Sequence, residues 1–534
     1  SILQRQKNKN PNTGYARDFI DLFKVIGKES YEKNIKIISN AGGVNIEEAV
    51  KQIKNIAEEN KMSGYKIGYV LGDDLKEKLP ELLKEGYEFI NSDNGRKLIE
   101  IQDKILNANV YFGREPIIEC LKGGANTVLT GRAADSALFL SPLMYEFGWR
   151  DDDYDNIARG IIVGHLLECG GQGAGGNYDY DWRAVPEMDN LGFPIASVSE
   201  NHTYITKTKT SGGLITEQSC KEQLLYEIHD PANYITPDVI ADVSQAKLKE
   251  ISKDKVELLG VKGKKRPDNL KLSIGYHAGY KVETYLNFAW PDAYEKAKYA
   301  AEIIMKKMKR KNLKVEDIRI DFLGLNALHL DIANMSDELV KNMNEVVMRI
   351  AIRTLTKEEA EKLIPEISPL QLNGPPGASF FWRKSKNSKC NRTLANIYSK
   401  RYCQTNFTYF GGKIMKKMYL KDIAHGRSGD KGNISNICVY ARREEDYPFL
   451  KKFLTVDRVK EHFKNIVTGE ITRYLVDSLN GMNFVMKEAL GGGATLSLRL
   501  DSLGKSMASA LMRLEIDSEL YNKYRKEGEN YEEK

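Results

Sequence analysis

The sequence is poor in cysteine, and its cysteines have no spacing typical of a disulfide framework or a metal site. Six cysteines are scattered over 534 residues without a CxxC pair: Cys120, Cys169, Cys220, Cys390, Cys403 and Cys438. Small secreted proteins place cysteines densely, whereas cytosolic proteins keep their thiols reduced. The cysteine pattern therefore predicts reduced thiols and a cytoplasmic protein.

Long apolar runs and a strong excess of one charge are also absent. No run of 18 apolar residues occurs, and the opening SILQRQKNKN is polar, so we expect neither a membrane-spanning segment nor a signal peptide. The chain has 80 basic and 74 acidic residues, a net charge of +6, and this slight excess predicts no nucleic-acid partner. Two basic clusters, within 262–266 and 306–311, are interpreted as solvated surface, with a phosphate-bearing ligand as the alternative.

The residues that are present indicate a globular, multi-domain protein. Hydrophobic residues make up 41% and charged residues 29% of the chain, which are ordinary values for a protein with a sizeable core. At about 100–200 residues per domain, the length predicts roughly three domains. The pattern divides the chain into an N-terminal extension (1–30), an α/β part (31–255), an α+β part (256–400, with a boundary within 384–400), a small α+β domain (415–520) and a polar tail (521–534).

The first half alternates short apolar runs with helical patterns. Strands are predicted at 35–39, 66–72, 107–112 and 126–131, and helices at 47–59, 134–147 and 154–167. Strands separated by helices in this rhythm indicate βαβ units, because right-handed crossovers return each strand in the same direction. We therefore expect a parallel sheet flanked by helices.

Polar residues follow each of these four strands: Asn40 and Asn45, Asp73 and Asp74, Arg114 and Glu115, and Arg132 and Asp135. In open parallel sheets, ligands bind outside the carboxyl ends of the strands. Each loop alone could be an ordinary turn, since Gly, Asp and Asn are common turn formers. The four loops together predict a binding site at this edge.

A glycine-dense segment follows the helix predicted at 154–167. Five of the seven residues 170–176 are glycine, too many for a helix interior at about 1 kcal/mol per glycine relative to alanine. We expect a loop whose backbone amides hold an oxyanion or a phosphate. The segment does not follow a strand as a dinucleotide-binding GxGxxG does, and GxxxxGK[ST] is absent, so nucleotide binding is a weak inference.

His165 and Glu168 lie three residues apart at the mouth of this segment. They could serve as base and acid in proton transfer. The alternative is a helix-end histidine beside a carboxylate at the edge of the core. Cys169 is interpreted as structural, because it follows the C-terminal end of a helix, where the helix dipole opposes a thiolate.

Two further segments carry candidate ligand-binding residues. Residues 182–194, with Glu187 and Asp189, have the composition of a pocket wall or a long ordered loop. A metal site built from His165, Glu168, Glu187 and Asp189 would suit Mg²⁺ or Mn²⁺, but no HExxH-like spacing supports it, so no metal ligand is predicted. Thr216 begins a helix that could hold an anion or simply be capped.

The second half indicates an α+β region and then a small α+β domain that is plausibly ferredoxin-like. Strands are predicted at 270–274, 318–323, 417–423, 434–440, 483–490 and 495–500, helices at 292–309 and 338–354, and a final helix after 500. The loop predicted at 424–433 carries Arg427, Asp430 and Lys431, which together suit a carboxylate or phosphate. Alternatively, Arg427 and Asp430 hold the turn, or the domain docks on a neighbour.

Several long motifs resemble one protein family along nearly the whole chain. These are NAGGVN from Asn40, TGRAADSALFLSPLMYEFGW from Thr130, GHLLECGGQ from Gly164, PEMDNLGFPIA from Pro186 and KEQLLYEIHDP from Lys221. In this order they resemble the acyclic terpene utilisation family, AtuA. The segment HGRSGDKGN from His425 is similar to the small ferredoxin-like domain of that family.

The resemblance implies a pathway class and not a reaction. The family takes its name from the degradation of acyclic terpenes such as citronellol and geraniol, where neighbouring enzymes handle branched acyl-CoA thioesters. We therefore expect a lyase, hydratase or hydrolase acting on a branched or unsaturated acid or its coenzyme A thioester. The alternative is a non-catalytic scaffold or an acyl-CoA-binding subunit of a pathway complex. A homo-oligomer, with other pathway enzymes as partners, is expected.

The enzyme hypothesis assigns proton transfer to His165, Glu168 and Asp135. The residues expected to contact substrate are Asn40, Asn45, Asp73, Arg114, Arg132, Gly171, Gln172, Gly173, Gly175, Gly176, Glu187, Asp189, Arg427, Asp430 and Lys431. The cofactor is left unknown.

Overall fold

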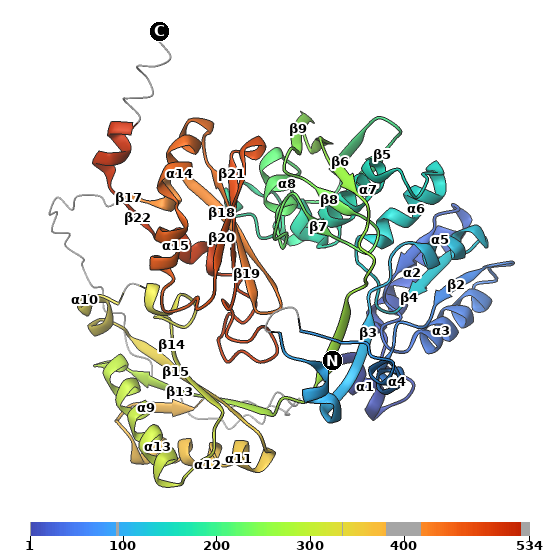
Figure 1. Ribbon diagram of the computed structural model, residues 1–534. Helices are drawn as coiled ribbons and strands as arrows, with labels where there is room; N and C mark the ends of the chain where they lie inside the picture. Colours follow the sequence, from blue (N-terminus) through green and yellow to red (C-terminus); the bar gives the residue numbers. More distant parts are fainter. Residues whose placement is uncertain (1, 92–94, 334, 381–417, 525–534) are drawn as a thin grey trace, which may run out of the picture. The chain divides into compact units, whose positions relative to one another are not determined.

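The computed structural model describes residues 2–91, 95–333, 335–380 and 418–524 (Figure 1). The chain forms two compact units, one of Ser1–Ala278 with Ile423–Met512 and one of Gly279–Asp422 with Arg513–Lys534. The boundary predicted within 384–400, Cys390 and Cys403 lie outside the described residues. The predicted mixed α/β fold, with a parallel sheet, an α+β middle region and a C-terminal ferredoxin-like domain, is confirmed.

A three-stranded parallel sheet forms the N-terminal part of the first unit. Its strands run in the order β1 (Ile37–Ser39), β4 (Thr127–Thr130), β2 (Ile67–Val70). The fourth predicted strand, β3 (Ile105–Val110), instead pairs antiparallel with β12 (Leu272–Tyr276). Parallel strands are buried on both faces, whereas β3 carries polar Asn107 and Asn109 on one face. The expectation of four parallel strands was therefore wrong for β3.

Helices cover both faces of this sheet (Figure 1). On one face Leu129 of β4 packs with Phe23 of α2 (Arg17–Glu32) and Ile53 of α3 (Ile46–Glu59). On the other face Val128 packs with Ile117 of α5 (Glu115–Lys122). Successive strand residues point to opposite faces, so β4 is buried on both sides. The remaining N-terminal helices are α1 (Ile2–Lys9), α4 (Leu79–Lys84), α6 (Ala137–Phe147) and α7 (Tyr154–Leu167).

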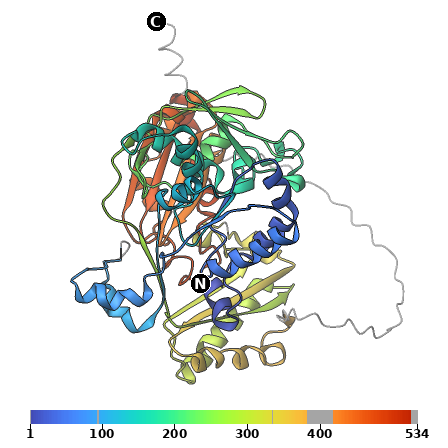
Figure 2. The same cartoon turned by 90° about the vertical axis from the view of Figure 1, so that its right-hand side faces the viewer.

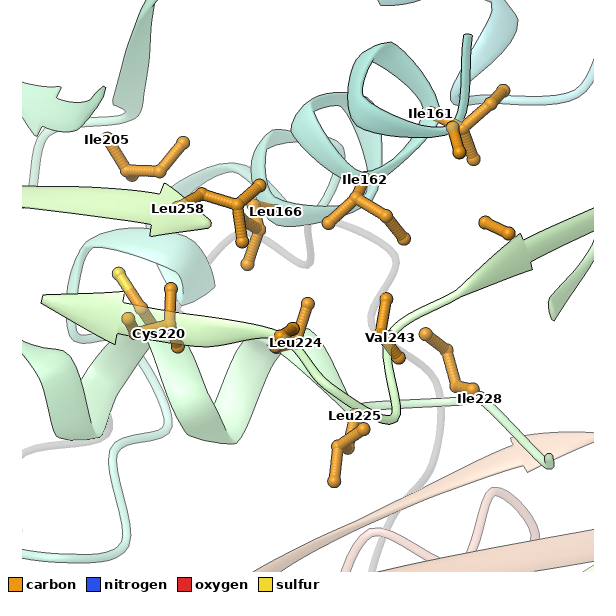
Figure 3. Packing of buried hydrophobic residues seen from close by; sticks show 14 of the residues in the cluster. Ile161, Ile162, Leu166, Ile205, Cys220, Leu224, Leu225, Ile228, Val243 and Leu258 are labelled. Atoms are coloured by element: carbon orange, nitrogen blue, oxygen red, sulfur yellow. The ribbon is translucent and has the colours of Figure 1, made fainter. Parts of the chain in front are cut away.

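Helix α7 lies at the centre of a large core, with Ile162 and Leu166 directed at Leu224 and Val243 (Figure 3). Two small antiparallel sheets and α8 (Glu217–Leu224) surround it. One sheet has the order β5 (Pro194–Val198), β6 (Thr203–Lys207), β10 (Lys255–Leu259), β9 (Lys247–Ser252). The other has the order β11 (Lys262–Lys264), β8 (Ile240–Asp242), β7 (Tyr234–Ile235).

The C-terminal part of the first unit is an antiparallel sheet with helices beside it (Figure 1). Its order is β18 (Ala424–Lys431), β19 (Ile434–Ala441), β21 (Gly481–Met486), β20 (Ile471–Val476), and its helices are α14 (Tyr447–Phe453), α15 (Val456–His462) and α16 (Met507–Leu511). The loop predicted at 424–433 is thus wrong: β18 spans most of it, and only Gly432 and Asn433 form the turn. No strand forms at 495–500.

The second unit contains a sheet of order β14 (Asp317–Leu323), β15 (Glu345–Thr354), β13 (Tyr280–Ala289), β16 (Ala378–Phe380) (Figure 2). The helix α9 (Ala293–Arg310) packs Ala297 and Ile304 on one face of it. Strand β15 occupies most of residues 338–354, so the helix predicted there was wrong. Short helices α10 (Asp337–Lys341), α11 (Lys357–Glu361), α12 (Ile364–Ile367) and α13 (Leu370–Asn373) follow, and β17 (Met418–Tyr419) pairs with β22 (Glu515–Ile516).

None of the described helices is both long and apolar enough to cross a membrane.

Candidate functional site

Hydrogen bonds link the polar residues that follow the three parallel strands. Asn40, after β1, donates from Nδ2 to Asp135 Oδ1 at 2.9 Å. Asp73, after β2, accepts from the backbone N–H of Arg132 at 3.0 Å. Since Arg132 and Asp135 both follow β4, the structure brings three of the four predicted loops together at one edge of the sheet.

The same edge carries a small cavity of about 190 Å³. Asp73 and Asp74 line it from the end of β2, and Asn45 lines it from the turn after β1. Asn45 also holds the N-terminal segment, because its Nδ2 donates to the carbonyl oxygens of Pro11 and Thr13 at 2.7 and 2.8 Å.

Arg114 lies away from this hydrogen-bonded set, in an ion pair of its own. Its side chain is 2% exposed, with Nη1 3.2 Å from Asp238 and Nη2 2.8 Å from Asp151. The backbone N–H of Arg114 also donates to Asp238 at 2.9 Å. Glu115 pairs with Arg266. These contacts attach the start of α5 to the segments around it.

His165 and Glu168 end α7 side by side, as expected from their spacing. His165 Nδ1 is 3.4 Å from Glu168 Oε1. The residue is 1% exposed, its ring centroid is 5.5 Å from that of Tyr234, and neither ring nitrogen hydrogen-bonds to any residue in the described ranges. The Glu168 side chain, 20% exposed, is the member of the pair that solvent reaches.

The glycine segment is a tight turn packed against apolar side chains. Residues Gly170–Ala174 form a short 3-10 helix, and Gly175 follows at φ +98°. A Cβ at Gly171 would lie 2.9 Å from Leu191, and one at Gly173 would lie 2.6 Å from the Leu166 carbonyl oxygen. Close packing thus requires these glycines, and the predicted oxyanion or phosphate role of the segment stays a prediction. The predicted substrate-binding roles of Gly176 and Gln172 also stay predictions. Gln172 donates a hydrogen bond to Gln223 at 3.0 Å.

Asp135 and Glu168 belong to one electrostatic cluster. Loss of solvation raises the pKa of Asp135, and the nearby Glu168 carboxylate raises it further, while Arg132 and Lys431 partly offset both. The Asp135 side chain is still exposed to solvent. An accessible carboxyl group with a raised pKa keeps its proton to a higher pH than an ordinary aspartate and is suited to donate it.

Strand β18 brings residues of the C-terminal domain into this cluster. Lys431 Nζ is 2.6 Å from Glu227 Oε2, and its charge interacts with Glu168 and Asp135. Asp430 lies 3.3 Å from Lys505, which in turn lies 3.3 Å from Glu227. The alternative in which Arg427 pairs with Asp430 is not formed, because Arg427 pairs with Glu222 and Asp430 with Lys505.

Sequence reasoning missed four members of this cluster: Tyr226, Glu227, Tyr234 and Lys505. The first two lie within the motif KEQLLYEIHDP, which was noted only for its resemblance. Lys505 is more than 270 residues from Tyr226, whose hydroxyl accepts its hydrogen bond, so no local pattern could have indicated the contact.

Arg427 is buried in a second network that joins β18 to α8. Its Nη2 is 3.0 Å from Glu222 Oε2, and His425 Nδ1 is 3.0 Å from Glu222 Oε1. Arg427 also donates to the carbonyl oxygen of Asn177 at 2.7 Å. The three charged or polar side chains are each at most 3% exposed, so the network attaches the C-terminal domain, and a substrate-binding role for Arg427 stays a prediction.

The remaining candidates are spread over the surface or have structural contacts. Glu187 and Asp189 are exposed, and Asn190 donates to Glu187 at 3.4 Å. Within the described ranges no group of three His, Cys, Asp or Glu side chains could hold a metal ion. Burial raises the pKa of the Cys169 thiol, and Thr216 caps its helix by accepting from the Ser219 N–H at 3.1 Å.

Comparison with known proteins identifies both parts of the chain. Residues 1–409 match the model of the acyclic terpene utilisation family protein AtuA, and residues 418–517 match the AtuA ferredoxin-like domain. Searches among curated proteins and among solved structures found no match. Because the first model alone spans well over half of the sequence, the chain belongs to the acyclic terpene utilisation family AtuA.

Proposed function

We propose that this protein is an enzyme that adds water to, or removes it from, a branched α,β-unsaturated carboxylic acid or its coenzyme A thioester. Membership of the AtuA family implies a role in acyclic terpene utilisation. Acyclic terpenes are branched and unsaturated, so their breakdown passes through acids of this class. The observation that carries the proposal is that two solvent-accessible carboxyl groups, Asp135 after β4 and Glu168 at the end of α7, interact electrostatically.

Hydration of a double bond needs one proton acceptor and one proton donor. The acceptor takes a proton from water while the water oxygen bonds to the β-carbon. The electron pair of the double bond moves towards the α-carbon and the carbonyl oxygen, and the donor then protonates the α-carbon. One carboxyl group can donate the proton and a second, as a carboxylate, can accept the other. Asp135, with its raised pKa, is assigned the donor role and Glu168 the acceptor role.

His165 has a supporting role in this proposal. A side chain that is 1% exposed does not contact a substrate in this state, but His165 Nδ1 lies 3.4 Å from Glu168 Oε1. Its imidazole therefore lies next to the carboxylate and limits the positions that this carboxylate can take. Asn40 holds Asp135 by a hydrogen bond of 2.9 Å.

Hydrolysis of the thioester is the second candidate reaction and has less support. It needs an activated nucleophile or an activated water molecule. The thiol of Cys169, which follows Glu168 in the chain, has a pKa raised by burial, which disfavours the thiolate. A scaffold or acyl-CoA-binding subunit without activity is the remaining alternative, and it does not account for the arrangement of Asp135 and Glu168. A homo-oligomer and a cytoplasmic location complete the proposal.

A binding and turnover screen tests this proposal. The pure protein is heated with free coenzyme A, with 3-methylbut-2-enoyl coenzyme A and with the free acid, and the same thioester is then followed for loss of its double bond. A ligand present at about 100 times its Kd adds about 2.7 kcal/mol of stability. We expect the thioester or the acid to raise Tm more than free coenzyme A does, and to be hydrated. Slow release of coenzyme A without hydration would instead favour the hydrolase.

A further inference from the structure

We propose that Lys431 is a further catalytic residue of this site, whose ammonium group binds the substrate carbonyl oxygen as negative charge develops there, with Glu227 and Lys505 as its positioning residues. The inference rests on the proposed function, which it extends to the C-terminal domain.

Lys431 is the accessible cation at the end of β18. Its side chain is 45% exposed, whereas that of Arg427, four residues earlier on the same strand, is 2% exposed and held by Glu222. An ammonium group has three N–H donors, and Glu227 Oε2 accepts one of them at 2.6 Å. Lys431 thus has donors left for a ligand, and Arg427 is committed to the protein.

The charge of Lys431 interacts with both proposed proton-transfer groups. Burial alone would lower the pKa of Lys431, but the carboxylates of Glu227, Glu168 and Asp135 outweigh it and raise the pKa. Lys431 therefore stays protonated at neutral pH. A fixed positive charge near the donor and acceptor is what an enolate oxygen needs for its stabilisation.

Glu227, which contacts Lys431, has an unusual backbone conformation. Glu227 has φ +58°, a left-handed conformation that is unfavourable in a residue other than glycine. It passes close to β18 at Gly429, where a Cβ would lie 2.6 Å from Glu227 Cγ. A strained residue opposite a glycine is the arrangement expected where a side chain must be held in one place.

Lys505 holds Glu227 from the other side. Its Nζ is 3.3 Å from Glu227 Oε1 and 3.3 Å from Asp430 Oδ1, and it donates to the Tyr226 hydroxyl. Burial would raise the pKa of Glu227, but Lys431, Tyr226 and Lys505 together lower it. Glu227 therefore remains a carboxylate that fixes Lys431, and does not itself exchange protons with the substrate.

In the hydration step Lys431 keeps its proton throughout. Water gives its proton to Glu168 and its oxygen to the β-carbon, and the electron pair of the double bond shifts to the carbonyl oxygen. That oxygen accepts a hydrogen bond from Lys431 while it is negative. When Asp135 protonates the α-carbon, the carbonyl double bond re-forms and the negative charge is lost.

Substitutions at Lys431 and Glu227 test the inference, with 3-methylbut-2-enoyl coenzyme A as the substrate. The variants are Lys431→Met, Lys431→Arg and Glu227→Gln, with Lys487→Met as control, because Lys487 is an exposed lysine paired with an exposed glutamate, Glu470. Loss of one stabilising donor for an oxyanion costs about 10²–10³ in kcat. We expect that loss for Lys431→Met, partial recovery for Lys431→Arg, and a fall in kcat with little change in KM for Glu227→Gln.

Acetylation of lysines by acetic anhydride gives a second measurement on the full chain. Bound thioester should slow acetylation of Lys431 several-fold and leave Lys487 unchanged, and Glu227→Gln should speed acetylation of Lys431. If the wild type turns the thioester over while Lys431→Met keeps its rate within about two-fold, the inference is wrong and the proposed function stands. If the wild type neither turns it over nor shows protection of Lys431, both fail.

Discussion

At the scale of single residues, substitution of Asp135 is expected to have a large effect on activity. Its asparagine variant can still accept the hydrogen bond from Asn40 but cannot donate the proton assigned to it. We expect Asp135→Asn to lower turnover by about 10²–10⁴, the usual contribution of a general acid or base. A steady-state assay on the thioester measures this, with Glu119→Gln on the exposed surface as a matched control that should retain full activity.

The same variant should show a pH-dependent effect on stability. The pKa of Asp135 is raised in the folded protein, so the folded state binds the proton more tightly than the unfolded chain does. The contribution of Asp135 to stability is complete below its ordinary pKa and is lost as pH rises through the folded value. Asp135→Asn should therefore gain Tm relative to the wild type as pH rises above the ordinary aspartate pKa of about 4. A constant difference in Tm would show that Asp135 is not perturbed.

At the scale of elements, the contact between α8 and β18 depends on one buried carboxylate. Glu222 accepts from the backbone N–H groups of Asp179 and Tyr180 at 3.1 and 3.0 Å and pairs with Arg427 and His425. Removing one member of a buried ion pair costs about 3–5 kcal/mol. Glu222→Gln should lose about that much in urea unfolding, whereas the exposed Glu461→Gln should stay within about 0.5 kcal/mol. Equal stability of the two variants would contradict the role given to Glu222.

Gly429 on β18 gives a second prediction at this scale. A Cβ there would lie 2.6 Å from Glu227 and 3.0 Å from Tyr226, so Gly429→Ala should displace Glu227 and loosen its pair with Lys431. Overpacking of this kind costs about 1–3 kcal/mol. Turnover should fall together with Tm, and acetylation of Lys431 should become faster. A variant with unchanged Lys431 reactivity would show that the close approach is not needed.

The elements that could be predicted from sequence are those whose pattern is local. The helix predicted at 154–167 is α7 with the same bounds, because its apolar residues recur at helical spacing. Strand β15 was predicted as a helix, since Val346, Met348, Ile350 and Ile352 face the core while apolar residues also lie between them, which hides the period of two. Strand β18 looked like a loop because its glycines and charged residues are buried by tertiary contacts.

The candidate site likewise combines residues that could be predicted from a local pattern with residues that could not. Asn40, Asp73 and Asp135 were predicted together because each follows a strand of one parallel sheet, and hydrogen bonds join Asn40 to Asp135 and Asp73 to Arg132. Tyr226, Glu227 and Lys505 were missed because they meet only when the C-terminal domain packs on α8. Such a contact joins residues far apart in the chain and leaves no local pattern.

At the scale of the whole molecule, the chain's first and last parts should unfold together. Residues Ser1–Ala278 and Ile423–Met512 form one compact unit with shared core residues such as Leu224 and Tyr440. Hydrogen exchange in increasing urea should therefore expose amides of α7 and β19 at one midpoint. Strands β13 and β15 belong to the other unit and are free to follow a different midpoint. Separate midpoints for α7 and β19 would contradict a single unit.

The most direct test of the central claim is the rate at which the pure protein hydrates 3-methylbut-2-enoyl coenzyme A, compared between the wild type and Glu168→Gln. Glu168 is the accessible member of the pair with His165, and its amide cannot accept the proton of water. Hydration by the wild type, reduced about 10²–10⁴ in Glu168→Gln at unchanged Tm, is the predicted result. Equal rates in the two proteins would contradict the assignment of the active site to this edge of the sheet.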